Sequence, residues 1–263
     1  MVMIPRSEWM LILEAACRAI SPYNTQPWRF RWDGDGVEIF LLRTKNFFLK
    51  LGGISYMTLG HLLENLSTAA QALGYKAEIQ LLGPDLNLEF PVARVTLKAA
   101  WEPEPILLNG LERRVTNRLP FSSRPLEGRA LEVLREGLGK EVGNRVHWLK
   151  GEEQVIASGI LADLECVRLS NYKLFKEACD FIRFDAEEYV AARDRLYVDS
   201  LGLTPWSQRW LKLMADRPYL HRSMKILMPH MLKREREKKY REFMRAAGLL
   251  VYVVEREDPA SYV

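Results

Sequence analysis

Two short segments of this 263-residue chain carry polar and charged side chains at a spacing that suits ligand binding. Tyr23-Asn24-Thr25-Gln26-Pro27-Trp28 is a polar turn closed by an aromatic residue. Arg113-Arg114-Val115-Thr116-Asn117-Arg118 gathers guanidinium groups, which pair with anions, around a hydroxyl. Each segment also has a plainer interpretation. The first is then a helix stop followed by a strand, and the second a solvated charged face.

Metal and disulfide chemistry find little support in the sequence. The cysteines are odd in number and have no CxxC spacing, so we interpret Cys17, Cys166 and Cys179 as reduced, buried small hydrophobes. The histidines are His61, His147, His221 and His230. They show no HExxH or other ligand spacing, so we expect no metal site.

The composition is that of a soluble globular protein, with 48% apolar and 27% charged residues. The length suits one large domain or two small ones and allows a sizeable core. A net charge of +4 permits anionic ligands and does not demand nucleic acid. No apolar run approaches the ~18 residues of a membrane span, and Glu14 and Arg18 interrupt the apolar stretch Met10–Ile20. We therefore expect a cytoplasmic protein with no membrane span.

The first part of the chain predicts a helix, a β-hairpin, a helix and two strands. Apolar residues recur at helical spacing over Glu8–Ile20, and Ser21-Pro22 stops that helix. Alternation over Trp28–Trp32, the turn Asp33-Gly34-Asp35-Gly36 and the apolar run Val37–Leu42 indicate a hairpin. A broad apolar stripe predicts a central helix over Ser55–Leu73, and strands are expected at Lys76–Leu82 and Val92–Lys98.

The second part begins after a proline-containing linker, Trp101–Leu108, with a new unit from Leu111. The expected elements are helices over Pro125–Leu138, Gln154–Leu169 and Tyr172–Arg195, and strands at Arg145–Leu149 and Gly248–Glu255. The basic, methionine-rich stretch Pro218–Arg245 allows three interpretations. It is a solvated amphipathic helix pair, a lid over a ligand pocket, or a basic helix on a membrane surface.

The polar turn and the arginine-rich segment described above both resemble sequence motifs of one protein family. Ser21-Pro22-Tyr23-Asn24-Thr25-Gln26-Pro27-Trp28 resembles the SPxxNxQPW motif of FMN-dependent nitroreductases. Arg114-Val115-Thr116-Asn117-Arg118, with Phe121 beyond it, resembles the R-x-S-x-R phosphate segment of that family. The usual order of the two motifs is reversed here.

The reversal fits a fusion of two nitroreductase subunits, since the usual enzymes are homodimers with FMN held between subunits. The resemblance to the single-chain, Acg-like branch implies that one chain builds one flavin pocket as an internal pseudo-dimer, and therefore a monomer. It extends loosely to Arg193-Asp194-Arg195-Leu196. The family carries a further helix and strands after the segment that matches Leu249–Glu255, so we expect the second half to be incomplete at Val263.

The resemblance implies cofactor-binding roles for the residues of both motifs. Arg114 and Thr116 would hold the FMN phosphate, and Arg118 would lie near the pyrimidine edge of the ring. Asn24 and the backbone of Ser21–Asn24 would contact the ring and the ribityl chain. The full expected set is Ser21, Pro22, Tyr23, Asn24, Arg114, Thr116 and Arg118. Asn24 and Arg114 must then converge on one crevice.

The resulting expectation is an α+β, nitroreductase-like fold, with one half over residues 1–108 and the other over 109–263, including a possible lid at 205–245. The expected function is an FMN-binding oxidoreductase that transfers reducing equivalents from NAD(P)H to a small electron-poor acceptor. The alternative is a protein that binds or sequesters flavin with little or no turnover.

Overall fold

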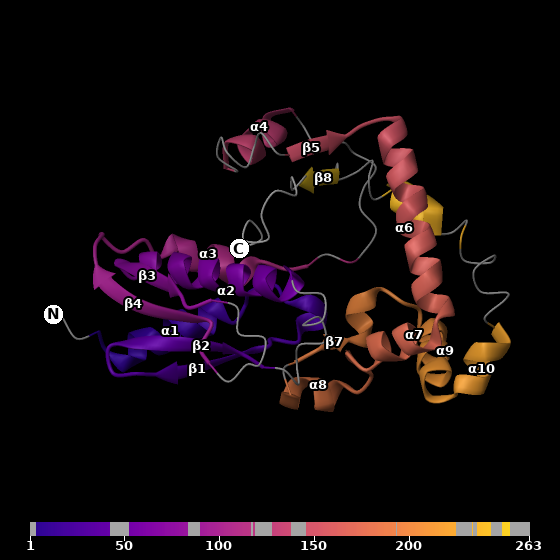
Figure 1. Ribbon diagram of the computed structural model, residues 1–263, viewed down its shortest axis with the longest axis horizontal. Coiled ribbons are helices and arrows are strands. Elements are labelled where there is room, and N and C mark those ends of the chain that lie inside the picture. The colour runs from indigo at the N-terminus through magenta and orange to yellow at the C-terminus, as the bar shows by residue number, and fades with distance from the viewer. Residues whose placement is uncertain are drawn as a thin grey trace. The chain divides into compact units, whose positions relative to one another are not determined.

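The computed structural model describes residues 4–42, 53–83, 90–116, 118, 128–137, 146–192, 194–224, 233, 236–242 and 249–252. The described chain is mixed α+β, as expected, with antiparallel strand pairs. It divides into two compact units (Figure 1). The first unit runs through Thr116 and takes in Glu187–Leu196, and the second holds Asn117–Ala186 and Tyr197–Pro259.

A four-stranded antiparallel sheet forms the base of the first unit. Its strands are β1 (Trp28–Trp32), β2 (Gly36–Leu41), β3 (Tyr75–Leu81) and β4 (Ala93–Ala99), in the spatial order β1-β2-β4-β3. The expected hairpin is confirmed, with Trp28 opposite Leu41 and Trp32 opposite Val37. Its turn is closed by Asp33, whose Oδ1 accepts the Gly36 backbone N–H at 2.9 Å.

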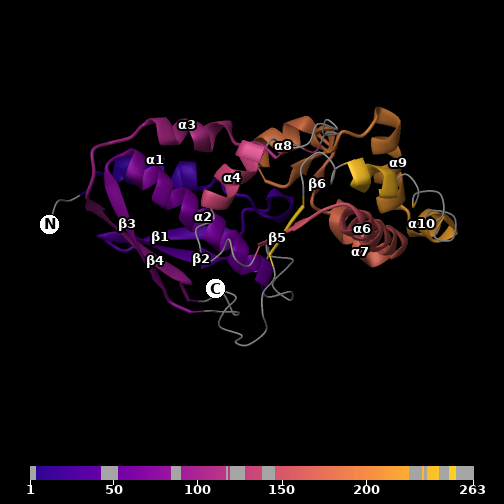
Figure 2. The ribbon, with the colours of Figure 1, turned by 90° about the horizontal axis from the view of Figure 1, so that it is seen from above.

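The described helices that pack into the core of the first unit are α1 (Arg6–Ala16), α2 (Gly53–Ala72) and α3 (Ile106–Arg113). The apolar stripe of α2 is buried, and α2 contacts α1, α3 and β3 (Figures 1 and 2). The largest fully buried side chains of this core are Trp9, Ile12, Ile39, Leu41, Leu62, Leu66, Val37, Val92 and Val95. The alternating strand residues and the helical stripe therefore meet in one core, which fixes the ends of α1 and α3 relative to the sheet.

Helix α3 spans the boundary after residue 108 that the sequence predicted between the two halves of the chain. Leu108 and Leu111 pack against the core of the first unit, so the whole helix belongs to that unit. The chain leaves α3 at Arg114, whose extended backbone (φ −61°, ψ 122°) ends the helix. Arg114 and Thr116 are thus carried by the first unit, whereas Arg118 belongs to the second.

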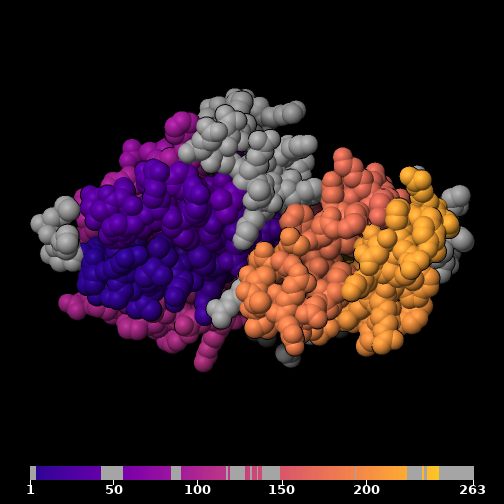
Figure 3. Space-filling model, turned by 90° about the horizontal axis from the view of Figure 1, so that it is seen from below, coloured from indigo at the N-terminus to yellow at the C-terminus, as the bar shows by residue number. Residues whose placement is uncertain are grey.

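The second unit is built mainly from helices around a separate small core. Its described elements are α4 (Gly128–Gly137), β5 (Val146–Leu149), α6 (Glu152–Ser170), α7 (Tyr172–Cys179), β6 (Ile182–Arg183), η4 (Val198–Leu201), α9 (Pro205–Asp216), α10 (Pro218–Met224) and β8 (Leu249–Tyr252). β5 and β8 pair antiparallel, so the two strands expected for this part are confirmed. Leu169, Phe175, Cys179, Met214 and Ala215 form the core. Figure 3 shows the salmon to yellow-orange segments of this unit packed together.

The long helix expected over Tyr172–Arg195 is wrong. α7 ends at Cys179, the chain forms the short strand β6, and α8 (Ala186–Ala192) begins afresh, followed by β7 (Leu196–Tyr197). The segment Phe181-Ile182-Arg183-Phe184 contains aromatic and β-branched residues, which favour extended backbone. Because the helix is interrupted here, most of α8 belongs to the first unit and α7 belongs to the second.

The basic stretch Pro218–Arg245 is only partly described. It opens with α10, and residues 236–242 are helical with Lys238–Glu242 and Arg241–Glu237 ion pairs one turn apart. Its role as a lid stays a prediction. None of the described helices is both long enough and apolar enough to span a bilayer.

Candidate functional site

The turn after α1 holds three non-glycine residues in the left-handed region of backbone space. Tyr23, Asn24 and Gln26 have φ values of 51°, 55° and 45°. Such a backbone is uncommon for residues with a Cβ and costs about 1 kcal/mol or more at each position. The turn is therefore held by its surroundings and not by the intrinsic preference of its residues.

Hydrogen bonds from two directions hold this turn. Within the turn, the Asn24 backbone N–H donates to the Ser21 carbonyl at 2.9 Å, and the Gln26 N–H donates to Ser21 Oγ at 3.0 Å. From the α8 segment, the Arg195 N–H donates to the Asn24 carbonyl at 2.9 Å. Asn24 Nδ2 in turn donates to the Arg195 carbonyl at 3.2 Å. The side chain of Asn24 is thus fixed in place beside the pocket described below.

Arg114 joins the end of α3 to the end of α1. Its Nη2 donates to the Arg18 carbonyl at 2.8 Å, and its Nη1 reaches Thr116 Oγ1 at 3.4 Å. The C-terminal end of a helix carries a partial negative charge, which a guanidinium group stabilises. Because these two contacts use only part of the five-donor fork, Arg114 keeps N–H groups for a ligand.

These elements surround a pocket of about 440 Å³ within the first unit. It is lined by Cys17, Arg18, Asn24, Gln26, Arg114, Tyr189 and Val190. No carboxylate stands among these described lining residues. Two guanidinium groups outweigh the roughly half charge at the end of α1, so the pocket favours an anion. Its volume lies in the range of about 300–1,000 Å³ typical of small-molecule sites.

The thiol of Cys17 lies in the wall of this pocket and is half-buried. Burial raises the pKa of the Cys17 thiol above its ordinary value of 9.0, and the nearby Glu14 carboxylate adds to the rise. A hydrogen bond with the Trp28 side chain acts in the opposite direction and is the weaker effect. Cys17 is therefore protonated at neutral pH and is a poor nucleophile there.

The structure brings together some of the residues that the sequence singled out. Asn24 and Arg114 line the same pocket, and Thr116 contacts Arg114 beside it. Ser21 is buried beneath the turn, while Pro22 and Tyr23 are half-buried parts of it that do not line the pocket. Arg118 is half-buried and belongs to the second unit.

Several pocket residues were not anticipated from the sequence. Cys17 was expected to be a reduced, buried small hydrophobe but is only half-buried, and Arg18, Tyr189 and Val190 were not considered for the site. The pairing of Arg195 with Asn24 spans 171 residues. The loose family resemblance of Arg193–Leu196 was the one signal in the sequence that pointed to this segment.

Comparison with known proteins adds no family assignment. The chain matches no protein-family model and no curated protein. The described residues contain no group of three or more histidine, cysteine, aspartate or glutamate side chains placed to hold a metal ion.

Proposed function

We propose that this chain is an FMN-binding oxidoreductase of the nitroreductase type that passes reducing equivalents from NAD(P)H to a small electron-poor acceptor. One observation carries the proposal. Asn24 and Arg114, from two motifs that both resemble nitroreductase signatures and lie 90 residues apart, line one pocket. A shared flavin site requires this convergence of the two motifs.

The residues of the pocket fit an anionic, hydrogen-bonding cofactor. Arg114 and Arg18 supply positive charge without a competing carboxylate among the described lining residues. The amides of Asn24 and Gln26 supply donors and acceptors, and Tyr189 and Val190 supply an aromatic and an apolar wall. FMN presents a phosphate, a polyol chain and a flat ring, which need these three kinds of partner.

The chain's own residues would bind and orient the cofactor. Arg114 would pair with the phosphate through the N–H groups that its contacts with Arg18 and Thr116 leave over. Asn24 is already held by Arg195, so its remaining amide hydrogen is pre-oriented at no further entropic cost. When bound, FMN supplies the hydride and electron chemistry that side chains lack.

A flavin titration with a matched pair of arginine variants tests the binding step. We expect full-length protein to bind FMN and quench its fluorescence, and Arg114→Ala to weaken binding about tenfold or more because a charge-assisted pair is lost. Arg113→Ala is the control. Arg113 is the neighbouring, exposed residue of α3, carries the same charge and does not line the pocket. Equal loss in both variants, or no binding by the parent chain, rejects the proposed site.

The oxidoreductase step has its own test. Anaerobic NADH or NADPH should bleach the yellow flavin absorbance of the loaded protein within minutes. Bound flavin that dithionite reduces and nicotinamides do not would instead assign the chain to flavin storage.

A further inference from the structure

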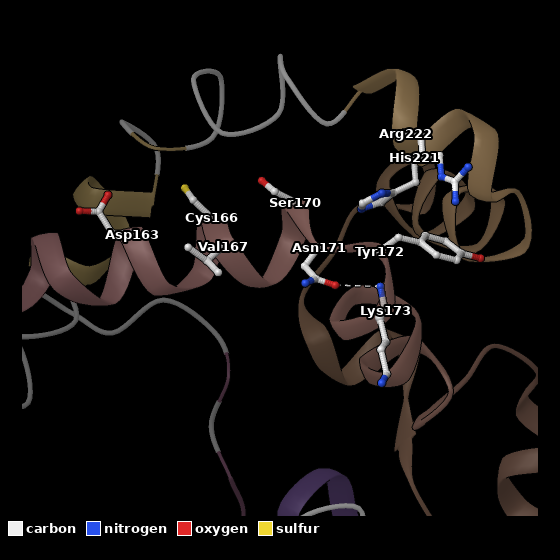
Figure 4. Close-up of a pocket in the computed structure, with 9 residues that line it drawn as sticks. All are labelled: Asp163, Cys166, Val167, Ser170, Asn171, Tyr172, Lys173, His221 and Arg222. Atoms are coloured by element: carbon white, nitrogen blue, oxygen red, sulfur yellow. Dashed lines mark hydrogen bonds between the residues drawn. The ribbon is translucent and has the colours of Figure 1, made fainter.

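A second cavity, of about 780 Å³, lies wholly within the second unit and has no part in the proposed flavin site. It lies beside the C-terminal part of α6, the start of α7 and α10 (Figure 4). Its described lining is Asp163, Cys166, Val167, Ser170, Asn171, Tyr172, Lys173, His221 and Arg222. Asp163, near one end, is ion-paired with Lys233 at 2.7 Å.

The most informative residue of this cavity is His221, whose side chain is fully buried. Its Nε2 lies 2.6 Å from the Leu169 carbonyl. A carbonyl oxygen only accepts, so Nε2 carries the hydrogen and Nδ1 of the neutral ring presents a lone pair. Nδ1 is buried and has no hydrogen-bond partner among the described residues. A buried acceptor without a donor lowers the stability of the fold, so a ligand that donates a hydrogen bond to Nδ1 would be favoured.

The ring of His221 cannot easily turn to find that partner elsewhere. It is packed against Tyr172 and Phe175, with ring centroids 5.2 and 4.9 Å away. Tyr172 is itself fixed, because its hydroxyl donates to the Ala215 carbonyl at 3.0 Å. The lone pair of Nδ1 is thus held in one orientation at the cavity wall.

A second unpartnered polar atom belongs to another residue of the cavity lining. Ser170 Oγ, at the end of α6, is buried and has no hydrogen-bond partner among the described residues. A serine hydroxyl in a helix ordinarily bonds to the carbonyl one turn back, so its isolation here is unusual. Figure 4 shows Ser170 and Cys166 on the same side of α6, with the His221 ring reaching from α10 toward that side. Cys166 and Val167 make the adjoining wall apolar.

We propose that this cavity binds a small, largely apolar molecule that carries a hydroxyl group. The hydroxyl hydrogen is donated to Nδ1 of His221, and its oxygen accepts from the Ser170 hydroxyl. One ligand group then satisfies both unpartnered atoms, while the remainder of the ligand packs against Cys166 and Val167. Mostly apolar walls with a few convergent polar groups are typical of small-molecule sites.

Phenol and anisole test the proposal on the full-length chain, because they share a ring and an oxygen and only phenol donates a hydrogen. With ¹⁵N-labelled histidine, the chain gives signals from four imidazoles, and the His221→Asn spectrum identifies that of His221. We expect phenol, at about millimolar concentration, to shift the His221 Nδ1 resonance, and anisole to bind at least about tenfold more weakly. Cyclohexanol distinguishes an aromatic from an aliphatic hydroxyl ligand, and either result supports the site.

Ser170→Ala supplies a variant that removes only an atom without a partner. We expect it to fold like the parent chain and to weaken phenol binding roughly three- to tenfold. Ser223→Ala is the control, since Ser223 lies in α10, is exposed and does not line the cavity. An unmoved His221 resonance, equal binding of anisole and phenol, or an unaltered affinity in Ser170→Ala would overturn the proposal.

Discussion

Asn24 and Arg195 exchange two hydrogen bonds although 171 residues separate them in the chain. The Arg195 N–H donates to the Asn24 carbonyl at 2.9 Å, and Asn24 Nδ2 donates to the Arg195 carbonyl at 3.2 Å. Both residues have left-handed backbones, with φ of 55° and 65°. The strained turn of the pocket and the segment after α8 therefore support each other. This pairing fixes the orientation in which Asn24 lines the pocket.

The pairing predicts that substitutions of Asn24 and of Arg195 lower the unfolding free energy by different amounts. Asn24→Ala keeps a Cβ in the left-handed region and loses the side-chain hydrogen bond, so we expect the unfolding free energy to fall by about 2 kcal/mol. Arg195→Gly keeps both backbone groups that contact Asn24 and relieves the strain of its own backbone, so the loss through this pairing should be smaller than in Asn24→Ala. Urea unfolding followed by fluorescence of the buried Trp9 and Trp28 measures both. Equal losses would show that the pairing does not hold the turn.

Two glycines of the first unit should respond to alanine in opposite directions. A Cβ on Gly36 in β2 would lie 2.5 Å from the Val95 carbonyl oxygen, so Gly36→Ala must displace a neighbouring strand. We expect a loss of about 2 kcal/mol or more in unfolding free energy. Gly60, in α2, is exposed and has no atom within 4 Å of its added Cβ, so Gly60→Ala should stabilise by about 0.5–1 kcal/mol. Thermal unfolding of the two variants beside the parent chain checks the signs.

The regular elements of the first unit were predictable because each has its own local signal. The Asp33–Gly36 turn between two alternating runs specified the hairpin, and the wide stripe of α2 specified a buried helix. The break between α7 and α8 was missed because helical spacing continues across it. The β-favouring residues Phe181–Phe184 were the contrary signal.

The pocket was only partly predictable for a different reason. Asn24 and Arg114 were singled out by motif resemblance, and the structure brings both to one pocket, although FMN binding there stays a prediction. Cys17 and Tyr189 have no sequence signal and Arg195 has only a loose family resemblance, because tertiary contacts alone bring these residues to the turn. Contacts between residues far apart in the chain leave no pattern among neighbours in the sequence.

Acid should weaken the hairpin through Asp33. Its carboxylate accepts from Arg94 Nε at 2.5 Å and from the Gly36 N–H, and Arg94 chiefly holds the pKa of Asp33 below its ordinary 3.8. Because the pKa of Asp33 is lower in the folded state than in the unfolded state, its ionised carboxylate stabilises the fold at pH values above the unfolded-state pKa. This stabilisation is lost as the pH falls through the folded-state pKa. Arg94→Gln should therefore unfold with a shallower pH dependence below about pH 4 than the parent chain.

Denaturant titrations between neutral pH and about pH 2.5 measure this difference. Asp33→Asn is the matched variant, since it removes the titrating group and should flatten the same window. Arg94 also pairs with Asp35, so both variants are needed to assign the effect to Asp33. Parallel pH curves for the parent chain and both variants would contradict the assignment.

The cysteines should react with iodoacetamide in an order set by burial and pKa. Cys17 is half-buried at the pocket with its thiol pKa raised by burial, and burial raises the pKa of Cys179 to about 12. Because the thiolate is the reactive form, Cys17 should be alkylated slowly at neutral pH and faster as pH rises past 9.0, with Cys179 far behind. Peptide mass spectrometry over time resolves the two sites, and Cys17→Ser confirms the assignment.

The same measurement locates the ligand in the first unit. Because Cys17 lines the pocket with Arg114, a bound molecule there covers its thiol. Saturating FMN should therefore slow alkylation of Cys17 at least several-fold and leave Cys179, in the core of the second unit, unchanged. The protection should be lost in Arg114→Ala at the same FMN concentration. Tight FMN binding with an unprotected Cys17 would place the cofactor elsewhere on the chain. The ligand of this pocket would then be an anion other than FMN.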